Sequence, residues 1–305
     1  MILNHLKIGD TIGIVSPASP VKTDYLKKGV NYLKSLGFNI KEGKYVYNKW
    51  GHLAGSDEDR AKDLMNMFLD DSVDMILCTR GGYGSMRILP YLNLDMIKKN
   101  PKIFGGFSDI TILLNLFYSQ CDFPTFHCPM VSCKFEDEFT TKSFLNTIMN
   151  TKTPYFIKNP PDVQMKSITD EVIEGTLVGG NLSLICNTIG TPYEIDTKDK
   201  ILFIEEIGEP PYKIDRMLTQ LILSNKLSSC KGIIVGQFTN CTLPHYQRSL
   251  TTSEVIYDRI VKLNKPTLLN FMSGHSYPKL TLPIGAKIKL NCKNSSLEVI
   301  SKIIK

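Results

Sequence analysis

The stretch Ile103-Phe104-Gly105-Gly106-Phe107-Ser108-Asp109-Ile110-Thr111 leads from a short apolar strand into an amphipathic helix. The two glycines permit a tight backbone turn at this junction that a Cβ atom would obstruct. The apolar spacing of residues 112–119 then predicts a helix that begins at once. A strand that turns directly into a helix is typical of a parallel α/β sheet.

Ser108 and Asp109 occupy this turn, and their residue types allow two interpretations. Both are favoured N-cap residues, so either side chain would simply cap the helix. Alternatively, a serine at a helix N-terminus presents its hydroxyl where the partial positive charge of the helix stabilises an oxyanion. The segment by itself leaves both interpretations open.

Strands and helices alternate upstream of this turn. Strands are predicted at residues 11–15, 39–47, 73–79 and from 103, and helices at 24–36, 56–69 and 86–92. Strands separated by helices of this length indicate βαβ units, in which ligands bind beyond the carboxyl ends of the strands. The segments of Ser16, Arg80 and Ser108 each follow a predicted strand. They therefore share one sheet edge, which favours a functional site there.

The pattern changes in the second half of the chain. Residues 151–173, with Thr153-Pro154 and Asn159-Pro160-Pro161, predict an inter-domain linker. Strands follow at 201–204, 232–238, 267–271 and 287–290, with helices at 182–189 and 215–223. We therefore expect an α/β protein with a parallel-sheet domain at 1–150 and a smaller, strand-rich α/β domain at 174–305.

Composition excludes several classes of function. The chain has 305 residues, 42% hydrophobic and 22% charged, with a formal charge of +6, as in ordinary soluble globular proteins. The lysines are scattered, without the basic stripe of a nucleic-acid-binding protein. No apolar run has transmembrane length, and no signal-peptide pattern opens the sequence. Eight irregularly spaced cysteines disfavour disulfides and zinc. We therefore expect a cytoplasmic protein without a metal, a nucleic-acid partner or a membrane partner.

A nucleophilic serine needs a base within hydrogen-bond reach and a group that orients the base. His275 follows a predicted strand on the loop Ser273-Gly274-His275-Ser276, a position that presents its side chain. A purely structural loop histidine fits the same position. The other histidines have less informative surroundings: His5 near the terminus, His52 and His245 in polar loops, and His127 in an apolar turn.

Glu205 and Glu206 end an otherwise apolar strand. Charges at the exit of a buried strand tend to occupy the edge of a site. Successive strand residues point to opposite faces, so only one of the two carboxylates can face a cleft. A solvated turn before a helix that starts near Asp215 is the alternative.

The loop Arg80-Gly81-Gly82-Tyr83-Gly84 follows the third predicted strand. A glycine-rich turn there could cradle a phosphate, but the sequence contains neither G-x-G-x-x-G nor G-x-x-x-x-G-K-[ST]. Its backbone amides could equally form part of an oxyanion hole. The Arg80 guanidinium suits a substrate carboxylate.

Several motifs together resemble the LD-carboxypeptidase family of serine peptidases, which also contains the microcin C self-immunity peptidases. The N-terminal matches are residues 15–18 (VSPA), 53–58 (LAGSDE), 80–84 (RGGYG) and 106–111 (GFSDIT). The C-terminal matches are 175–183 (GTLVGGNLS), 203–218 (FIEEIGEPPYKIDRML), 274–275 (GH) and 282–285 (LPIG). They occur in the family's order along nearly the whole chain.

The resemblance implies a Ser-His-Glu triad of Ser108 as nucleophile, His275 as base and Glu205 as the orienting acid. Glu206, where the family often has Asp, is the runner-up for the acid. The resemblance also implies a Rossmann-like N-terminal domain that carries the serine and a C-terminal domain that carries the acid and the histidine, with the site between them. The further site residues expected are the backbone amides of Gly82 and Asp109 as oxyanion donors, and Arg80 and Tyr83 as substrate-binding residues.

The implied reaction is hydrolysis of the L,D-peptide bond to the terminal D-alanine of murein tetrapeptides during cell-wall recycling. The implied partners are a small peptide substrate and a second copy of the chain in a homodimer, with no cofactor and no metal. The stretch 208–216 (GEPPYKIDR) is closer to the muropeptide branch than to the immunity branch.

Three alternatives stay open. The same triad could cleave a microcin-type peptidyl-nucleotide amide. A periplasmic-type binding module would need an export signal, which the sequence does not show. An α/β-hydrolase esterase shares the Ser, acid, His order but expects a glycine two residues after the serine, where Ile110 stands.

Overall fold

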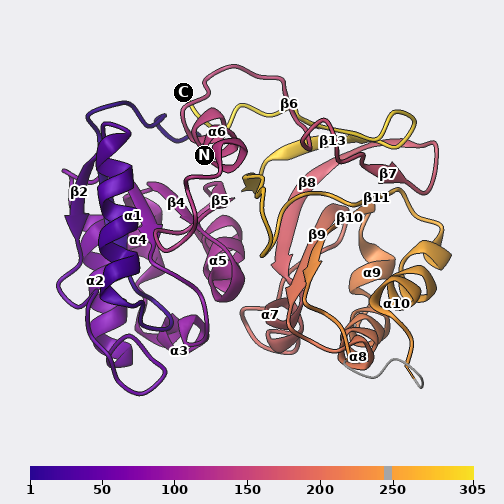
Figure 1. Ribbon diagram of the computed structural model, residues 1–305, viewed down its shortest axis with the longest axis horizontal. Coiled ribbons are helices and arrows are strands. Elements are labelled where there is room, and N and C mark those ends of the chain that lie inside the picture. Colours follow the sequence, from indigo (N-terminus) through magenta and orange to yellow (C-terminus); the bar gives the residue numbers. More distant parts are fainter. Residues whose placement is uncertain (244–248) are drawn as a thin grey trace. The chain divides into compact units, whose positions relative to one another are not determined.

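The computed structural model describes residues 1–243 and 249–305, which form two α/β units (Figure 1). The first unit contains Met1–Lys152, Thr281–Gly285 and Lys302–Lys305, and the second contains Thr153–Leu280 and Ala286–Ser301. The expected α/β class is confirmed. Residues 153–173 differ from the expected linker, because they lie within the second unit and contribute strands to its sheet. The return of residues 281–285 and 302–305 to the first unit also differs from the expected boundaries.

The first unit is built on a sheet with the strand order β12-β5-β4-β3-β1-β2. Its strands are β1 (Thr11–Val15), β2 (Asn39–Glu42), β3 (Met75–Cys78), β4 (Ile103–Gly106), β5 (Thr125–His127) and β12 (Leu282–Ile284). All neighbours pair in parallel except β12, which is antiparallel to β5. The order places β2 and β3 on opposite sides of β1. Ligands in such doubly wound sheets bind where the strand order reverses, beyond the carboxyl ends of the strands.

Helices α1 to α5 of this unit connect its parallel strands, and α6 follows the last of them, β5. They are α1 (Thr23–Ser35), α2 (Asp57–Leu69), α3 (Ser85–Ile88), α4 (Leu94–Lys99), α5 (Thr111–Cys121) and α6 (Glu138–Ile148), with short 3-10 turns η1 (Leu89–Tyr91) and η2 (Ser108–Ile110). The helix predicted at 86–92 is divided into α3 and η1, with Pro90 in the first turn of η1. Strand β2 ends at Glu42, earlier than predicted, because residues 44–47 form turns.

Aromatic side chains fill the core of the first unit. Phe104 of β4 and Phe117 of α5 make an edge-to-face contact with ring centroids 4.9 Å apart. Phe68 of α2 packs on both rings. All three side chains are fully buried. This cluster anchors α2 and α5 to the sheet and so fixes the direction in which the chain leaves β4.

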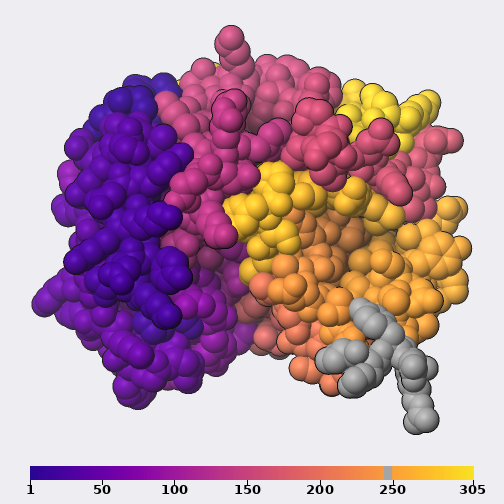
Figure 2. Space-filling view, viewed as in Figure 1, coloured from indigo at the N-terminus to yellow at the C-terminus, as the bar shows by residue number. Residues whose placement is uncertain are grey.

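The second unit contains a sheet of order β6-β14-β13-β8-β9-β10-β11-β7. Its strands are β6 (Tyr155–Ile157), β7 (Lys166–Ser167), β8 (Val172–Asn181), β9 (Lys200–Ile207), β10 (Gly232–Thr239), β11 (Thr267–Leu269), β13 (Lys287–Asn291) and β14 (Ser296–Val299). The four strands β8 to β11 run parallel, and the outer pairings are antiparallel. In the space-filling view the yellow C-terminal segment lies beside the pink residues near 160, as the pairing of β14 with β6 requires (Figure 2).

The helices of this unit are α7 (Leu182–Asn187), α8 (Pro211–Leu223), α9 (Lys226–Ser229) and α10 (Thr252–Arg259), followed by the 3-10 turn η4 (Val261–Leu263). Helix α8 packs against α9 and α10, and the three lie together in Figure 1. It begins at Pro211, earlier than predicted, because proline suits the first position of a helix. Strand β9 continues through Glu205 and Glu206 to Ile207. Both carboxylates therefore lie inside the strand and not in a turn after it.

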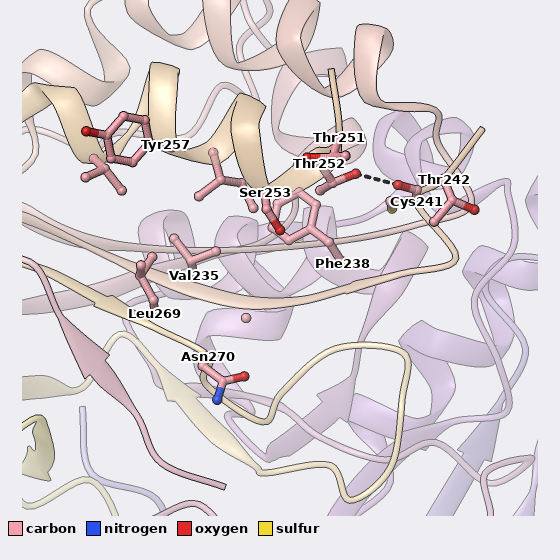
Figure 3. A pocket seen from close by; sticks show the side chains of 13 residues that line it. Val235, Phe238, Cys241, Thr242, Thr251, Thr252, Ser253, Tyr257, Leu269 and Asn270 are labelled. Atoms are coloured by element: carbon pink, nitrogen blue, oxygen red, sulfur yellow. Dashed lines mark hydrogen bonds between the residues drawn. The ribbon is translucent and has the colours of Figure 1, made fainter. Parts of the chain in front are cut away.

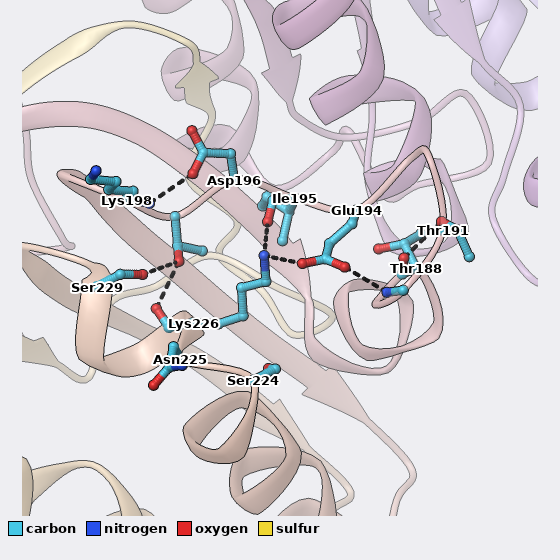
Figure 4. A network of polar contacts seen from close by, with 12 residues as sticks. Thr188, Thr191, Glu194, Ile195, Asp196, Lys198, Ser224, Asn225, Lys226 and Ser229 are labelled. Atoms are coloured by element: carbon cyan, nitrogen blue, oxygen red, sulfur yellow. Dashed lines mark hydrogen bonds and ion pairs between the residues drawn. The ribbon is translucent and has the colours of Figure 1, made fainter.

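A polar network ties the connection between α7 and β9 to α9 (Figure 4). The Lys226 ammonium donates a 2.9 Å hydrogen bond to the Ile195 carbonyl and forms an ion pair with Glu194. This ion pair lowers the pKa of the Glu194 carboxyl. The Thr197 hydroxyl donates to the Lys226 carbonyl at 2.8 Å. These contacts hold the segment from which β9 starts.

The eight cysteines are all free thiols, and all except the half-exposed Cys133 are buried. Burial raises the pKa of Cys186 to about 12 and of Cys121 and Cys241 to about 11. Because the thiolate is the reactive form, these thiols stay unreactive at pH 8 in the folded protein.

We therefore expect iodoacetamide at pH 8 to modify Cys133 first in the native protein and all eight cysteines after denaturation. Mass spectrometry of the intact chain measures the number of adducts. In Cys133→Ser the rapid native adduct should be absent. Rapid labelling of several buried cysteines would contradict this packing.

Within the described ranges, no helix has both the length and the apolar character that crossing a membrane requires.

Candidate active site

Ser108 lies in the turn between β4 and α5, in a strained backbone conformation. Its φ is +64°, in the left-handed region that non-glycine residues rarely adopt. Such a conformation costs of the order of 1–3 kcal/mol and is typical of functional sites. The N-cap residue of α5 is Ile110, so neither Ser108 nor Asp109 caps this helix and the capping interpretation is wrong. The strand-to-helix turn presents the half-buried Ser108 side chain at the carboxyl edge of the sheet.

The glycine-rich loop after β3 lies against this serine. A Cβ atom on Gly81 would stand 2.7 Å from Ser108 Cβ and 2.9 Å from its Oγ. Only glycine therefore lets the loop approach so closely. The loop after β1 also binds the glycine-rich loop, because the Ser19 hydroxyl accepts a 3.1 Å hydrogen bond from the Tyr83 amide. The structure thus brings the segments after β1, β3 and β4 together, as the strand pattern predicted.

Asp109 joins the serine turn to the glycine-rich loop through its side chain. Its carboxylate accepts a 2.7 Å hydrogen bond from the Ser85 amide, and the Ser85 hydroxyl donates to the Asp109 carbonyl at 2.5 Å. Both residues are buried, and burial raises the pKa of the Asp109 carboxyl. The two bonds fix the spacing between residues 81–85 and the turn that carries Ser108.

Arg60 is a buried residue of this edge that the sequence analysis did not single out. Its guanidinium donates to the carbonyls of Pro17, after β1, and Gly84, after β3, the second at 2.8 Å. It also pairs with Asp57. The signal was present in the spacing, because Arg60 is aligned with the apolar face of α2, four residues before Leu64. A charge on such a face indicates a buried polar contact.

Arg80 and Tyr83 are exposed on the same edge. The Arg80 guanidinium reaches the Pro20 carbonyl at 3.4 Å, and the Tyr83 ring lies 5.7 Å from the His52 ring. Gly82, between them, has a φ of +104° and is also exposed. These residues stay candidates for substrate contacts and for an oxyanion donor.

In the second unit the side chains of Glu205 and His275 are in contact. Glu205 Oε2 lies 2.6 Å from His275 Nδ1. The Glu205 side chain is fully buried, and that of His275 is 11% exposed. A carboxylate at this distance holds the proton on Nδ1 and makes Nε2 the basic nitrogen of the ring. His275 comes from the loop after β11, next to Gly274 with a φ of +144°. An imidazole held in this way can accept a proton at Nε2.

Glu206 points to the other side of β9, as strand alternation requires. Its carboxylate accepts hydrogen bonds from Asn181 Nδ2 at 3.0 Å and from the Ser183 amide and hydroxyl at 2.8 and 2.7 Å. These partners belong to the end of β8 and the first turn of α7. Glu206 thus connects α7 to the sheet, while Glu205 faces the histidine.

The remaining histidines lie elsewhere. His5 Nδ1 is 2.8 Å from the Lys305 carbonyl, near the chain ends. His127 is buried within strand β5, which differs from the turn expected for it. His52 is exposed, and its ring lies tilted at 39° to the Tyr83 ring. His245 falls outside the described residues. Within the described residues, 1–243 and 249–305, no group of three or more His, Cys, Asp or Glu side chains is arranged to hold a metal ion.

A separate cavity of about 530 Å³ opens in the second unit beside α10 (Figure 3). Val235 and Phe238 of β10, Leu269 and Asn270 at the end of β11 and Tyr257 of α10 contribute to its lining. Neither Glu205 nor His275 lines it. The cavity is therefore distinct from the carboxylate–imidazole pair, and the sequence analysis did not predict it.

Comparison with known proteins gives matches along most of the chain. Residues 12–128 match the model of the LD-carboxypeptidase N-terminal domain, and residues 174–290 match that of the LD-carboxypeptidase C-terminal domain. The probable murein peptide carboxypeptidase of Bacillus subtilis is 41% identical over 94% of this chain and 90% of its own length. The microcin C7 self-immunity protein MccF of Escherichia coli is 26% identical over 98% of this chain and 95% of its own length.

Among solved structures, the muramoyltetrapeptide carboxypeptidase from Oxalobacter formigenes superposes with a TM-score of 0.84 at 29% identity. The match covers 95% of this chain and 99% of that protein.

Proposed function

The chain belongs to the LD-carboxypeptidase family, and we propose on this premise that it is a serine carboxypeptidase that hydrolyses the L,D-peptide bond to the terminal D-alanine of murein tetrapeptides. The 41% identity to a probable murein peptide carboxypeptidase supports this substrate class. The observation that carries the proposed chemistry is the 2.6 Å contact between Glu205 and His275, since it orients a base for a serine nucleophile. The strained turn at Ser108 supports the choice of nucleophile.

In the proposed mechanism, His275 Nε2 takes the hydroxyl proton of Ser108 as Oγ attacks the carbonyl carbon of the L-residue. The backbone amides of Gly82 and Asp109 stabilise the oxyanion of the tetrahedral intermediate. Its collapse breaks the C–N bond, and the imidazolium returns the proton to the leaving D-alanine amine. A water molecule then attacks the acyl-enzyme, with His275 again as base, and releases the shortened peptide and Ser108. Glu205 keeps the imidazole oriented and stabilises its charged form throughout.

Arg80 and Tyr83 complete the proposed site as substrate-binding residues. Arg80 is exposed beside the glycine-rich loop, where its guanidinium suits the terminal carboxylate of the peptide. Tyr83 presents nearly half of its surface to solvent on the same loop. The proposed chemistry requires neither a metal nor an organic cofactor.

The direct test is release of D-alanine from purified tetrapeptides that carry either L-lysine or meso-diaminopimelate before the terminal residue. We expect D-alanine and the tripeptide as the only products, with a preference for one of the two stems. Absence of release from both peptides under conditions in which the protein is folded would refute the proposed substrate.

A microcin-type peptidyl-nucleotide is the second candidate substrate, because the 26% identity to a self-immunity protein extends over 98% of this chain. The same acyl-enzyme chemistry serves both amides. Parallel assays with a tetrapeptide and a peptidyl-adenylate analogue separate the two. Turnover of the analogue alone would assign the protein to the immunity branch.

The two neighbouring glutamates are expected to respond differently to the same substitution. Glu205→Gln removes the charge that orients His275 and should lower kcat by about 10²-fold, with an unchanged unfolding temperature. Glu206→Gln weakens the bonds to Asn181 and Ser183, so it should cost about 1–3 kcal/mol of stability and leave kcat within a few-fold. Steady-state kinetics and thermal unfolding of both variants measure the two effects. A larger loss of kcat in Glu206→Gln would assign the acid to Glu206.

We also propose a cytoplasmic location and a homodimeric state. The eight free cysteines support a reducing compartment. Cell fractionation tests the location, and sedimentation equilibrium of the purified chain tests the dimer.

A further inference from the structure

Strand β10 contains a bulge opposite Glu205. Val235 pairs with Ile204, but the next pair joins Phe238 to Glu206. Gly236 and Gln237 on β10 therefore both stand opposite the single residue Glu205. An extra residue in one strand bends it locally and redirects a side chain, and such bulges occur next to active sites. Here the redirected side chain is that of Gln237.

Gln237 holds the loop of His275 on both sides of the histidine. Its backbone amide donates a 2.9 Å hydrogen bond to the Ser273 carbonyl. Its side-chain oxygen accepts a 2.9 Å bond from the Ser276 amide, and its side-chain nitrogen donates to the Pro278 carbonyl at 3.2 Å. One residue thus binds the loop at three points that flank the imidazole.

Gly274 shows how closely this loop is packed. Its φ is +144°, and a Cβ atom there would lie 2.9 Å from Gln237 Cβ and 3.1 Å from Glu205 Oε2. The glycine backbone therefore lies close to both Gln237 and Glu205, with no room for a side chain. Because the interior is close-packed here, a displacement of Gln237 also displaces the backbone of this loop.

We propose that Gln237 is a positioning residue, which holds the loop of residues 273–278 so that the His275 imidazole stays aligned with Glu205. This inference rests on the proposed function, in which His275 is the base. Gln237 touches neither reacting atoms nor substrate in that mechanism. Its loss removes no reacting group but frees the loop that carries His275, and a displacement of about 1 Å of a catalytic group costs about 10²-fold in rate.

The variant that tests this is Gln237→Leu, which keeps most of the side-chain volume and removes the side-chain hydrogen bonds to Ser276, Pro278 and the Met272 sulfur. We expect kcat for D-alanine release to fall by about 10- to 100-fold while KM stays within about twofold, since substrate contacts are unchanged. Gln220→Leu is the matched control, because Gln220 lies exposed on α8. It should leave kcat unchanged.

A second measurement is independent of any substrate. The Nδ1 proton of His275, shared with Glu205, is observable by proton NMR as a far-downfield resonance that His275→Ala assigns. We expect this resonance to shift or broaden in Gln237→Leu and to stay unchanged in Gln220→Leu. If the wild-type protein releases no D-alanine, the proposed function fails, but the resonance still decides whether Gln237 positions the imidazole.

An unchanged resonance together with a kcat within twofold of the wild type would overturn the inference. If Gln237→Leu does not fold, Gln237→Asn decides by the same two readouts, because it keeps both polar groups and shortens the reach by one methylene. An Asn variant with wild-type resonance and kcat would equally refute the positioning role.

Discussion

Ser108→Ala is expected to lower kcat for D-alanine release by at least about 10³-fold, because no other group replaces the nucleophile. The backbone amides of Gly82 and Asp109 stay in place in this variant, so weak residual activity and substrate binding should remain. Steady-state kinetics measure the loss, and a mass increase from an acyl-enzyme should be absent from quenched reactions of the variant.

The fold should survive this change, since alanine keeps the Cβ atom that packs against Gly81. Ser119→Ala is the matched control, because Ser119 is an exposed serine on α5, the helix that follows the nucleophile. It should retain full activity. Ser108→Gly should be equally inactive and no less stable than Ser108→Ala, because glycine adopts the φ of +64° without strain. Release of D-alanine by Ser108→Ala at a near-wild-type rate would remove the mechanism.

His275→Ala should produce a loss of similar size, at least about 10³-fold in kcat, because the hydroxyl of Ser108 is a weak nucleophile without a base. The change also removes the 2.6 Å contact of the buried Glu205 carboxylate with the imidazole. Part of the cost should therefore appear as lower stability, because the imidazole no longer offsets the burial of this carboxylate. Kinetics and thermal unfolding at pH 5 and pH 8 separate the two effects.

His5→Ala is the control for this variant, since the His5 ring lies against the Lys305 carbonyl near the chain ends. It should keep wild-type kcat. Partial rescue of His275→Ala by added imidazole would support the role of base. A His275→Ala protein that retains more than a tenth of wild-type kcat would contradict it.

The elements of the first unit were predictable because they depend on local patterns. Apolar runs predicted β1, β3 and β4, and helical spacing predicted α1 and α2 close to their observed bounds. The glycines after β3 and at the end of β4 predicted tight turns at one sheet edge, and Gly81 does lie against Ser108. The strands β5, β12 and β14 were not predicted, because their sequences TFH, LPI and SLEV contain polar residues or a proline and do not form continuous apolar runs.

Contacts between residues distant in sequence were not predictable in this way. Arg60 joins the loops after β1 and β3. Its position on the apolar face of α2 is a sign of a buried polar contact, but the sequence does not identify the carbonyls that it binds. The return of residues 281–285 to the first unit depends on antiparallel pairing with β5, which no local pattern specifies. The role of Gln237 depends on a register shift in β10, and a bulge of this kind has no signature in composition.

The sequence by itself determined the strand-turn-helix unit around Ser108, because glycine, apolar periodicity and residue type act over a few neighbouring residues. It also determined that Glu205 and Glu206 point to opposite faces, since strand alternation is local. Only the tertiary structure decided which of them meets His275. That choice depends on the register of β9, the bulge in β10 and the packing of the loop after β11. These features are set by contacts between residues far apart in the sequence, such as Glu205 and His275, which are 70 positions apart.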